Sequence, residues 1–151
     1  MFFFSIGFST HADFLLKTNV YHDLIGAYGI EGDIQLDKQS SVSLDLKVHT
    51  PYSKLLNIAA IIFSGGTRFT FALGSNVRRS TFYVTPGIFY YRGYYGSFLR
   101  HGLIASTVFG YQIYIGSLYL ALGLGPHVRY YIEYKEFDWG IFPDACIGFR
   151  F

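Results

Sequence analysis

The stretch Ser117–Tyr134, which reads SLYLALGLGPHVRYYIEY, decides the fold that this sequence predicts. Its residues alternate with a period of two, as side chains do when successive residues of a β-strand point to opposite faces. One face is almost entirely aliphatic and consists of Leu118, Leu120, Leu122, Leu124, Val128, Tyr130 and Ile132. The other face mixes small and charged residues, namely Tyr119, Ala121, Gly123, Gly125, His127, Arg129, Tyr131 and Glu133. This division is typical of a strand with lipid on one side and a crowded barrel interior on the other.

The composition of the chain indicates the same architecture. Hydrophobic residues make up 51% of the 151 residues, yet no apolar run reaches the length of about 18 residues that a spanning helix needs. Because hydrocarbon cannot satisfy backbone N–H and C=O groups, a membrane protein without such helices must be a closed barrel. A soluble lipocalin-type barrel is the alternative, but it needs roughly 25–35% charged residues on its surface, and only 15% of the chain is charged. The net charge of +2 is too small to indicate a nucleic-acid partner.

The same alternation recurs along the rest of the chain and predicts eight strands. At about 9–11 residues for each tilted strand, eight strands use roughly 80 residues and leave turns and loops of ordinary length. We therefore predict an all-β fold, an eight-stranded antiparallel up-and-down transmembrane β-barrel over residues 13–151. The strands are expected at about 14–22, 28–36, 42–49, 67–73, 81–91, 98–112, 117–134 and 141–151.

Several connections are less regular. Periodicity leaves Pro51–Gly66 open as a packed loop, a short interfacial helix or the upper part of the fourth strand. Arg78 and Arg79 are expected in a solvated polar turn, with binding of lipid phosphate as the alternative. Pro86 removes a ladder donor, so it is expected at a bulge or a strand end. Further connections are expected at Arg92–Ser97 and Lys135–Gly140.

The first residues have the character of a processing signal. The apolar segment Phe2–Phe8 is followed by Ser-Thr-His-Ala, which is compatible with a small-residue cleavage site. No basic residues precede the apolar segment. Residues 1–12 are therefore predicted to be a signal peptide truncated at its start and cleaved after Ala12. An unprocessed N-terminal extension is the alternative.

Six short motifs carry a resemblance to a known group of proteins. They are LKTNV at 16–20, YGIEG at 28–32, SVSL at 41–44, TPGIFYY at 85–91, GYQ at 110–112 and GFRF at 148–151. With these motifs the chain resembles the small OmpA/OmpX-like outer-membrane barrels, and among them an uncharacterised barrel family of Bacteroidota-type bacteria. The insertion Leu55–Phe63 departs from that pattern.

The resemblance implies a location and partners. The location is the outer membrane of a Gram-negative bacterium, and the partners are outer-membrane lipid and the barrel-assembly machinery. In such barrels the assembly machinery reads a final strand that ends in an aromatic residue, and Ile147, Phe149 and Phe151 resemble that signal. A monomer is expected.

The predicted inward faces hold five basic and five acidic residues. An eight-stranded barrel is only just wide enough for side chains to fill it, and unpaired buried charges are costly. We therefore expect a charge network that plugs the lumen and excludes an open pore. The predicted network consists of Lys17, Lys47, Arg68, Arg129 and Arg150 with Glu31, Asp33, Asp45, Glu133 and Asp144.

Catalytic, metal and cofactor sites are not predicted. A His-x-Ser arrangement on one strand face would supply a base and a nucleophile, but none follows His49, His101 or His127. His101 and Ser106 differ by an odd number and should face opposite sides. Cys146 is expected to be a small packed residue. The leading hypothesis is a non-enzymatic barrel that acts structurally or through its loops; a deacylase-like lipid A-modifying enzyme and, less favoured, a narrow channel are the alternatives.

Overall fold

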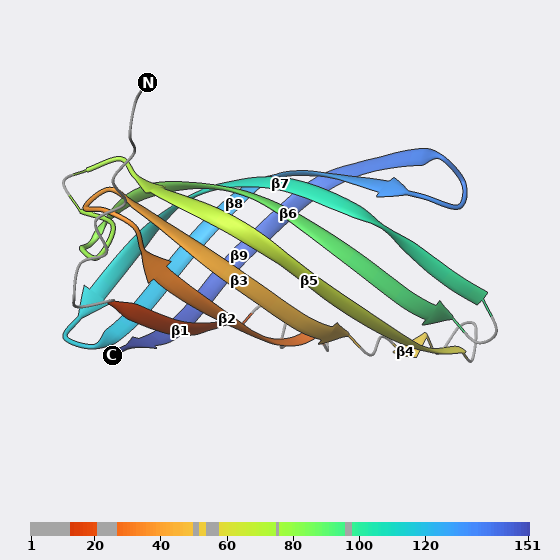
Figure 1. Cartoon of the computed structure of the whole chain (residues 1–151), viewed down its shortest axis with the longest axis horizontal. Coiled ribbons are helices and arrows are strands. Elements are labelled where there is room, and N and C mark those ends of the chain that lie inside the picture. Colours follow the sequence, from red (N-terminus) through yellow and green to blue (C-terminus); the bar gives the residue numbers. More distant parts are fainter. Residues whose placement is uncertain (1–12, 21–26, 50–51, 54–57, 75, 96–97) are drawn as a thin grey trace, which may run out of the picture.

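Eight long strands close into an antiparallel barrel in the computed structural model, which describes residues 13–20, 27–49, 52–53, 58–74, 76–95 and 98–151 (Figure 1). Apart from the short β4, each strand pairs with the next strand along the chain, with β3 pairing to β5, and the pairing β1–β9 closes the wall. The predicted eight-stranded up-and-down barrel is therefore confirmed as a fold. The strands are β1 (Phe14–Asn19), β2 (Ala27–Gln35), β3 (Ser40–His49), β5 (Ile58–Ala72), β6 (Thr81–Tyr95), β7 (Phe98–Ile115), β8 (Leu118–Tyr131) and β9 (Glu136–Arg150), with the short β4 (Tyr52–Ser53) paired to the start of β5.

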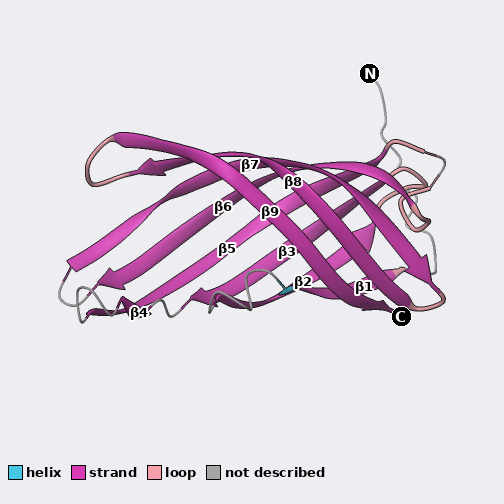
Figure 2. Cartoon of the chain, turned by 180° about the vertical axis from the view of Figure 1, so that it is seen from behind, coloured by secondary structure: helices cyan, strands magenta, loops and turns pink. Residues whose placement is uncertain are grey.

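The register of the wall defines how strongly the strands are staggered. Starting at Leu16 of β1 and passing from partner to partner through β2, β3, β5, β6, β7 and β8, the path arrives at Trp139 of β9. The direct β9 partner of Leu16 is Phe149, ten residues further along. Closing a sheet with such a stagger requires strands tilted by about 35–45° to the barrel axis, and the slanted strands are visible in Figure 2.

The alternation of the sequence separates the two faces of the wall. On β3 the inward side chains of Ser43 and Asp45 are each 1% exposed. The outward side chains of Leu44 and Leu46, which alternate with them, are 69% and 66% exposed. Phe149 and Leu122 are likewise exposed on β9 and β8. Within the described ranges, no helix is long and apolar enough to cross a membrane. The wall is thus apolar outside and polar inside.

Several predicted strand boundaries are wrong. For Pro51–Gly66 a packed loop, a short helix and part of the fourth strand were the alternatives. The structure has a strand from Ile58 onward, so β5 begins nine residues before the predicted Thr67. β6 continues through the predicted connection to Tyr95, and β9 already begins at Glu136, so that Trp139 lies in a strand and not in a loop. The hairpin between β8 and β9 occupies residues 132–135. Polar and aromatic residues suggested a loop at the end of β6 and at the start of β9, and an apolar run with two glycines hid the start of β5. Cross-strand pairing carries each strand beyond the predicted point.

Pro86 neither ends β6 nor introduces a bulge. Arg68 pairs with Gly87 on one side of the proline and Phe71 pairs with Val84 on the other, so the register is unchanged across it. Next to the proline, the Thr85 hydroxyl donates to Thr70 Oγ1 at 3.1 Å and links β6 to β5 there. The predicted bulge or strand end is therefore wrong, because the pairs that flank Pro86 hold the register with both β5 and β7.

The two ends of the barrel differ. Leu15 at the start of β1 pairs with Arg150 at the end of β9, so both chain ends of the barrel lie at one end, which we call the terminal end. The turns 36–39, 73–80 and 116–117 lie there too, and Gly116 supplies the positive φ of 61° that the two-residue hairpin requires. At the opposite end, the far end, β5 to β9 extend beyond β1 to β3 (Figure 1).

Candidate functional site

Arg68 is the centre of an ion-pair network inside the barrel. Its guanidinium lies 3.1 Å from Asp144, 3.4 Å from Asp45 and 3.8 Å from Glu31, and its side chain is 2% exposed. Asp144 also accepts hydrogen bonds from the Asn19 amide at 2.7 Å and from other buried donors. Because β2, β3, β5 and β9 each supply one of the four charged groups, the contacts join opposite parts of the wall.

Lys17 and Lys47 extend this network along the axis. Lys17 Nζ lies 3.1 Å from Glu31 and 3.5 Å from Asp33, while Lys47 Nζ lies 2.6 Å from Asp45. Serines of β3 donate to the same carboxylate oxygens that Lys17 contacts, since Ser41 donates to Asp33 Oδ2 at 3.0 Å and Ser43 donates to Glu31 Oε1. Partners of this kind are what a buried charge needs to be tolerated.

The turn 73–80 supplies a fourth buried cation. Arg78 is 5% exposed, and its Nη2 lies 2.7 Å from Asp33 Oδ1. The neighbouring Val77 is 1% exposed, its N–H donates to the Lys38 carbonyl at 2.7 Å, and Gln112 donates to its carbonyl. The turn therefore folds into the terminal end of the barrel and closes it. The space beneath it, beside Lys17 and Gln112, is too small for a water molecule.

The prediction that Arg78 is solvated is therefore wrong. Burial acts to lower the pKa of its guanidinium, but the Asp33 carboxylate and then Tyr114 raise the pKa above its ordinary value. Strand periodicity cannot find such a residue because it lies in a turn. The available signal was Val77, an aliphatic residue between Asn76 and Arg78 in an otherwise polar segment.

Seven of the ten predicted network residues come together in this interior: Lys17, Lys47 and Arg68 with Glu31, Asp33, Asp45 and Asp144. With Arg78 they make four cations and four anions joined by ion pairs. The charges inside the barrel are thus balanced. The fourth cation is Arg78 of the turn 73–80 and not one of the predicted strand residues.

Three predicted residues lie outside this network. Arg129 is half-buried on the inner face nearer the far end, where it donates to the Tyr131 hydroxyl at 3.2 Å and lies over the Tyr91 ring. Arg150 is exposed at the terminal rim and pairs with Asp13 at 3.0 Å. Glu133 lies in the β8–β9 hairpin, because β8 ends at Tyr131 and the strand period stops there.

Glu133 instead binds His101 of β7. Its Oε1 accepts hydrogen bonds from the His101 backbone N–H and from Nδ1, both at 2.6 Å. Although desolvation acts to raise the pKa of Glu133, its own backbone N–H and that of His101 lower it below its ordinary value. Ser106 is 7% exposed and faces inward, on the opposite side of β7 from His101, so no hydroxyl of β7 stands beside this pair on the strand.

Other sites of chemistry do not emerge from the described part of the chain. No group of three His, Cys, Asp or Glu residues there could hold a metal ion. Cys146 is buried against Leu15, Tyr83 and Tyr119 and lies 3.4 Å from an Asp144 oxygen. Gly123 leaves room for larger neighbours, because a Cβ there would come within 2.7 Å of the Tyr83 hydroxyl.

Comparisons of the chain with protein-family models, with characterised proteins and with solved structures find no match.

Proposed function

We propose that this protein is an integral outer-membrane β-barrel of a Gram-negative bacterium, monomeric and non-enzymatic. The observation that carries this proposal is the distribution of charge across the wall. Among outward strand positions of the described residues, the charged side chains are Arg92 and, when protonated, His101, whereas the interior holds the balanced network around Arg68. A wall that is apolar outside and ionic inside is suited to lipid and not to water.

The dimensions of the outer face agree with this. Phe137 and Trp139, 73% and 79% exposed, stand near the start of β9. Phe149 near its end and Phe151 just after it are 56% and 76% exposed. Ten residues separate Trp139 from Phe149, and at about 3.4 Å per residue and a tilt of about 40° they span about 25 Å. Membrane barrels have an apolar band of about this height between two aromatic girdles.

The internal network supports a structural or surface-interaction role. A lumen filled by paired side chains stabilises the wall, and the far end, where β5 to β9 extend beyond β1 to β3, offers surface for contacts with other molecules. Such barrels carry their longer extensions on the exterior, so we place the far end, where β5 to β9 project beyond β1 to β3, outside. Ile147, Phe149 and Phe151 remain our candidates for the signal read by the assembly machinery.

The single tryptophan of the chain gives a direct test. Refolded protein is mixed with vesicles of phosphatidylcholine, or with vesicles whose acyl chains are brominated at defined depths. Trp139 fluorescence should be quenched most by bromine near the headgroups, and the unheated protein should migrate differently from the boiled protein on a gel. A protein that stays in the aqueous phase without detergent, with unquenched Trp139, would overturn the proposal.

One observation favours a second candidate, the deacylase-like lipid A-modifying enzyme. The His101–Glu133 pair has the base-and-orienting-carboxylate geometry of acyl hydrolases and lies toward the far end of the barrel. Lipid A incubated with the refolded protein is examined by mass spectrometry. Loss of acyl chains that His101→Ala abolishes would replace the non-enzymatic proposal, whereas unchanged lipid A supports it.

A further inference from the structure

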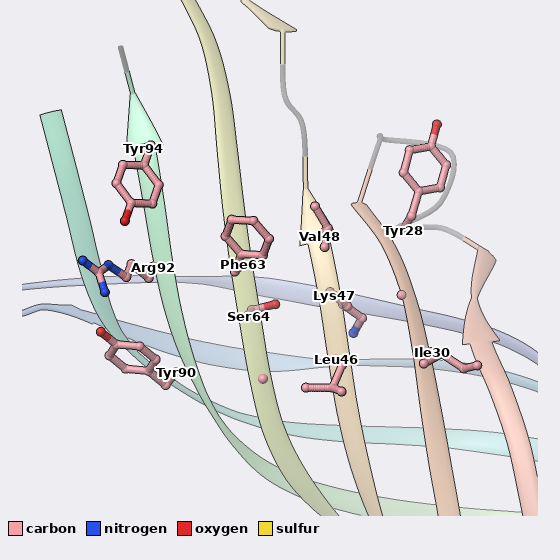
Figure 3. Close-up of a pocket in the computed structure, with 12 residues that line it drawn as sticks. Tyr28, Ile30, Leu46, Lys47, Val48, Phe63, Ser64, Tyr90, Arg92 and Tyr94 are labelled. Carbon is pink, nitrogen blue, oxygen red and sulfur yellow. The ribbon is translucent and has the colours of Figure 1, made fainter. Parts of the chain in front are cut away.

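A hollow of about 800 Å³ lies on the outer wall toward the far end, across β2, β3, β5 and β6 (Figure 3). We call it the wall groove. Its lining is mostly apolar and aromatic, with Arg92 between Tyr90 and Tyr94 at one side. The lining residues are Tyr28, Gly29, Ile30, Leu46, Lys47, Val48, Phe63, Ser64, Gly65, Tyr90, Arg92 and Tyr94.

The register explains why the wall is hollowed there. One cross-strand row places Phe63 between Val48 and Arg92, and the next row places Gly65 between Leu46 and Tyr90. Gly65 has no side chain, so a gap opens between the two larger residues of its row. The volume falls within the range of about 300–1,000 Å³ that is usual for small-molecule sites.

Arg92 gives the wall groove its charge. Its guanidinium lies 5.6 Å from the centre of the Tyr94 ring, and its neighbour across the ladder is His101, whose Nδ1 is taken by Glu133. An arginine on the lipid face costs about 2–4 kcal/mol at the bilayer midplane and about 0–1 kcal/mol near the interface. Its position between tyrosines therefore corresponds to the headgroup level. There its planar guanidinium can bind a phosphate with two parallel hydrogen bonds.

We propose that the wall groove binds one molecule of a phosphorylated, acylated glycolipid of the lipid A class. An acyl chain lies in the hollow over Gly65, and a phosphate lies on Arg92. This inference rests on the proposed function, because the far end meets the outer leaflet only if the barrel spans the outer membrane with that end outside. The cation and the adjoining apolar hollow together match a ligand that carries an anionic head and a hydrocarbon chain.

Two variants and one control test the inference. Arg92→Gln removes the cation. Gly65→Val places a branched side chain on the floor of the hollow between Leu46 and Tyr90. Its Cβ would meet the flexible Leu46 side chain at 3.2 Å and the Asp45 carbonyl at 3.7 Å, so the barrel should fold. Arg79→Gln is the matched control, since Arg79 is an exposed arginine at the opposite end.

The measurement is native mass spectrometry of delipidated, refolded protein in detergent, titrated with bis-phosphorylated lipid A, with the same lipid freed of phosphate, or with phosphatidylglycerol. Wild type and Arg79→Gln should retain one lipid A, Arg92→Gln should bind it at least ten-fold more weakly, and Gly65→Val should also bind it more weakly than wild type. The dephosphorylated lipid should bind wild type as weakly as lipid A binds Arg92→Gln.

Equal binding of lipid A by wild type and Arg92→Gln, or tighter binding of phosphatidylglycerol than of lipid A, would overturn the inference. A barrel that inserts into vesicles and shifts on the gel but retains no lipid A also overturns it, while leaving the proposed function intact. If the chain neither inserts nor shifts on the gel, the proposed function itself fails.

Discussion

At the scale of single residues, Arg68 carries the largest electrostatic consequence. It contacts three buried carboxylates, and Asp144 has no other cation within ion-pair distance among the described residues. Arg68→Met should destabilise the barrel by about 3–5 kcal/mol, because it leaves buried charge uncompensated. Arg150→Met removes an ion pair whose arginine is 41% exposed, and should cost about 0–1 kcal/mol. Urea unfolding in micelles measures both, and equal midpoints would contradict the role of Arg68.

The adjacent arginines of the turn 73–80 form a second pair for comparison. Arg78 is buried and bound to Asp33, whereas Arg79 is exposed. Arg78→Ala should destabilise the barrel by about 3 kcal/mol or more, since it leaves Asp33 one cation short in a closed space. Arg79→Ala should change stability by less than about 0.5 kcal/mol. Urea unfolding in micelles measures both variants. A similar loss of unfolding free energy in the two would show that the turn does not close the barrel through Arg78.

At the scale of elements, the stability of the hairpin between β2 and β3 depends on pH. Asp37 Oδ1 accepts the N–H groups of Gln39 at 2.7 Å and Ser40 at 2.8 Å. A hydrogen bond from the Ser40 side chain, followed by that from the Gln39 N–H, lowers the pKa of Asp37 below its ordinary value. The stability that this contributes is present above the unfolded-state pKa of about 3.9 and is lost as pH falls through the lower folded-state pKa.

The amide NMR signals of Gln39 and Ser40 should therefore shift together below about pH 3.9. Asp37→Asn keeps an acceptor oxygen but does not titrate, so its amide signals should stay constant over the same range. A wild-type midpoint at or above the unfolded value would show that the carboxylate does not hold this turn.

At the scale of the whole molecule, the filled interior predicts the absence of conductance. Four cations and four anions pair inside the wall, and the turn 73–80 closes the terminal end. Wild-type protein in planar bilayers should give no stable conductance steps, because an eight-stranded barrel has little more interior than its side chains occupy. Reproducible steps of one size at neutral pH would favour the narrow channel instead.

The strand period, the up-and-down order of the strands and the polarity of each face could be predicted from the sequence alone. Leu44 and Leu46 alternate with Ser43 and Asp45, and this local alternation is enough to separate an apolar outer face from a polar inner one. The eight strands follow because each such segment is separated from the next by turn residues. Most of the inner charges could be named for the same reason.

Only the tertiary structure decided where the strands end and which charges meet. Partners across the ladder carry β6 to Tyr95 and start β9 at Glu136, although the local residues resemble a loop. Closure of the wall brings Arg68 to Asp144, and the turn 73–80 brings Arg78 to Asp33. The wall groove likewise depends on the cross-strand neighbours of Gly65. Periodicity is a property of consecutive residues, whereas register, stagger and the filling of a closed interior depend on residues that are distant in the chain.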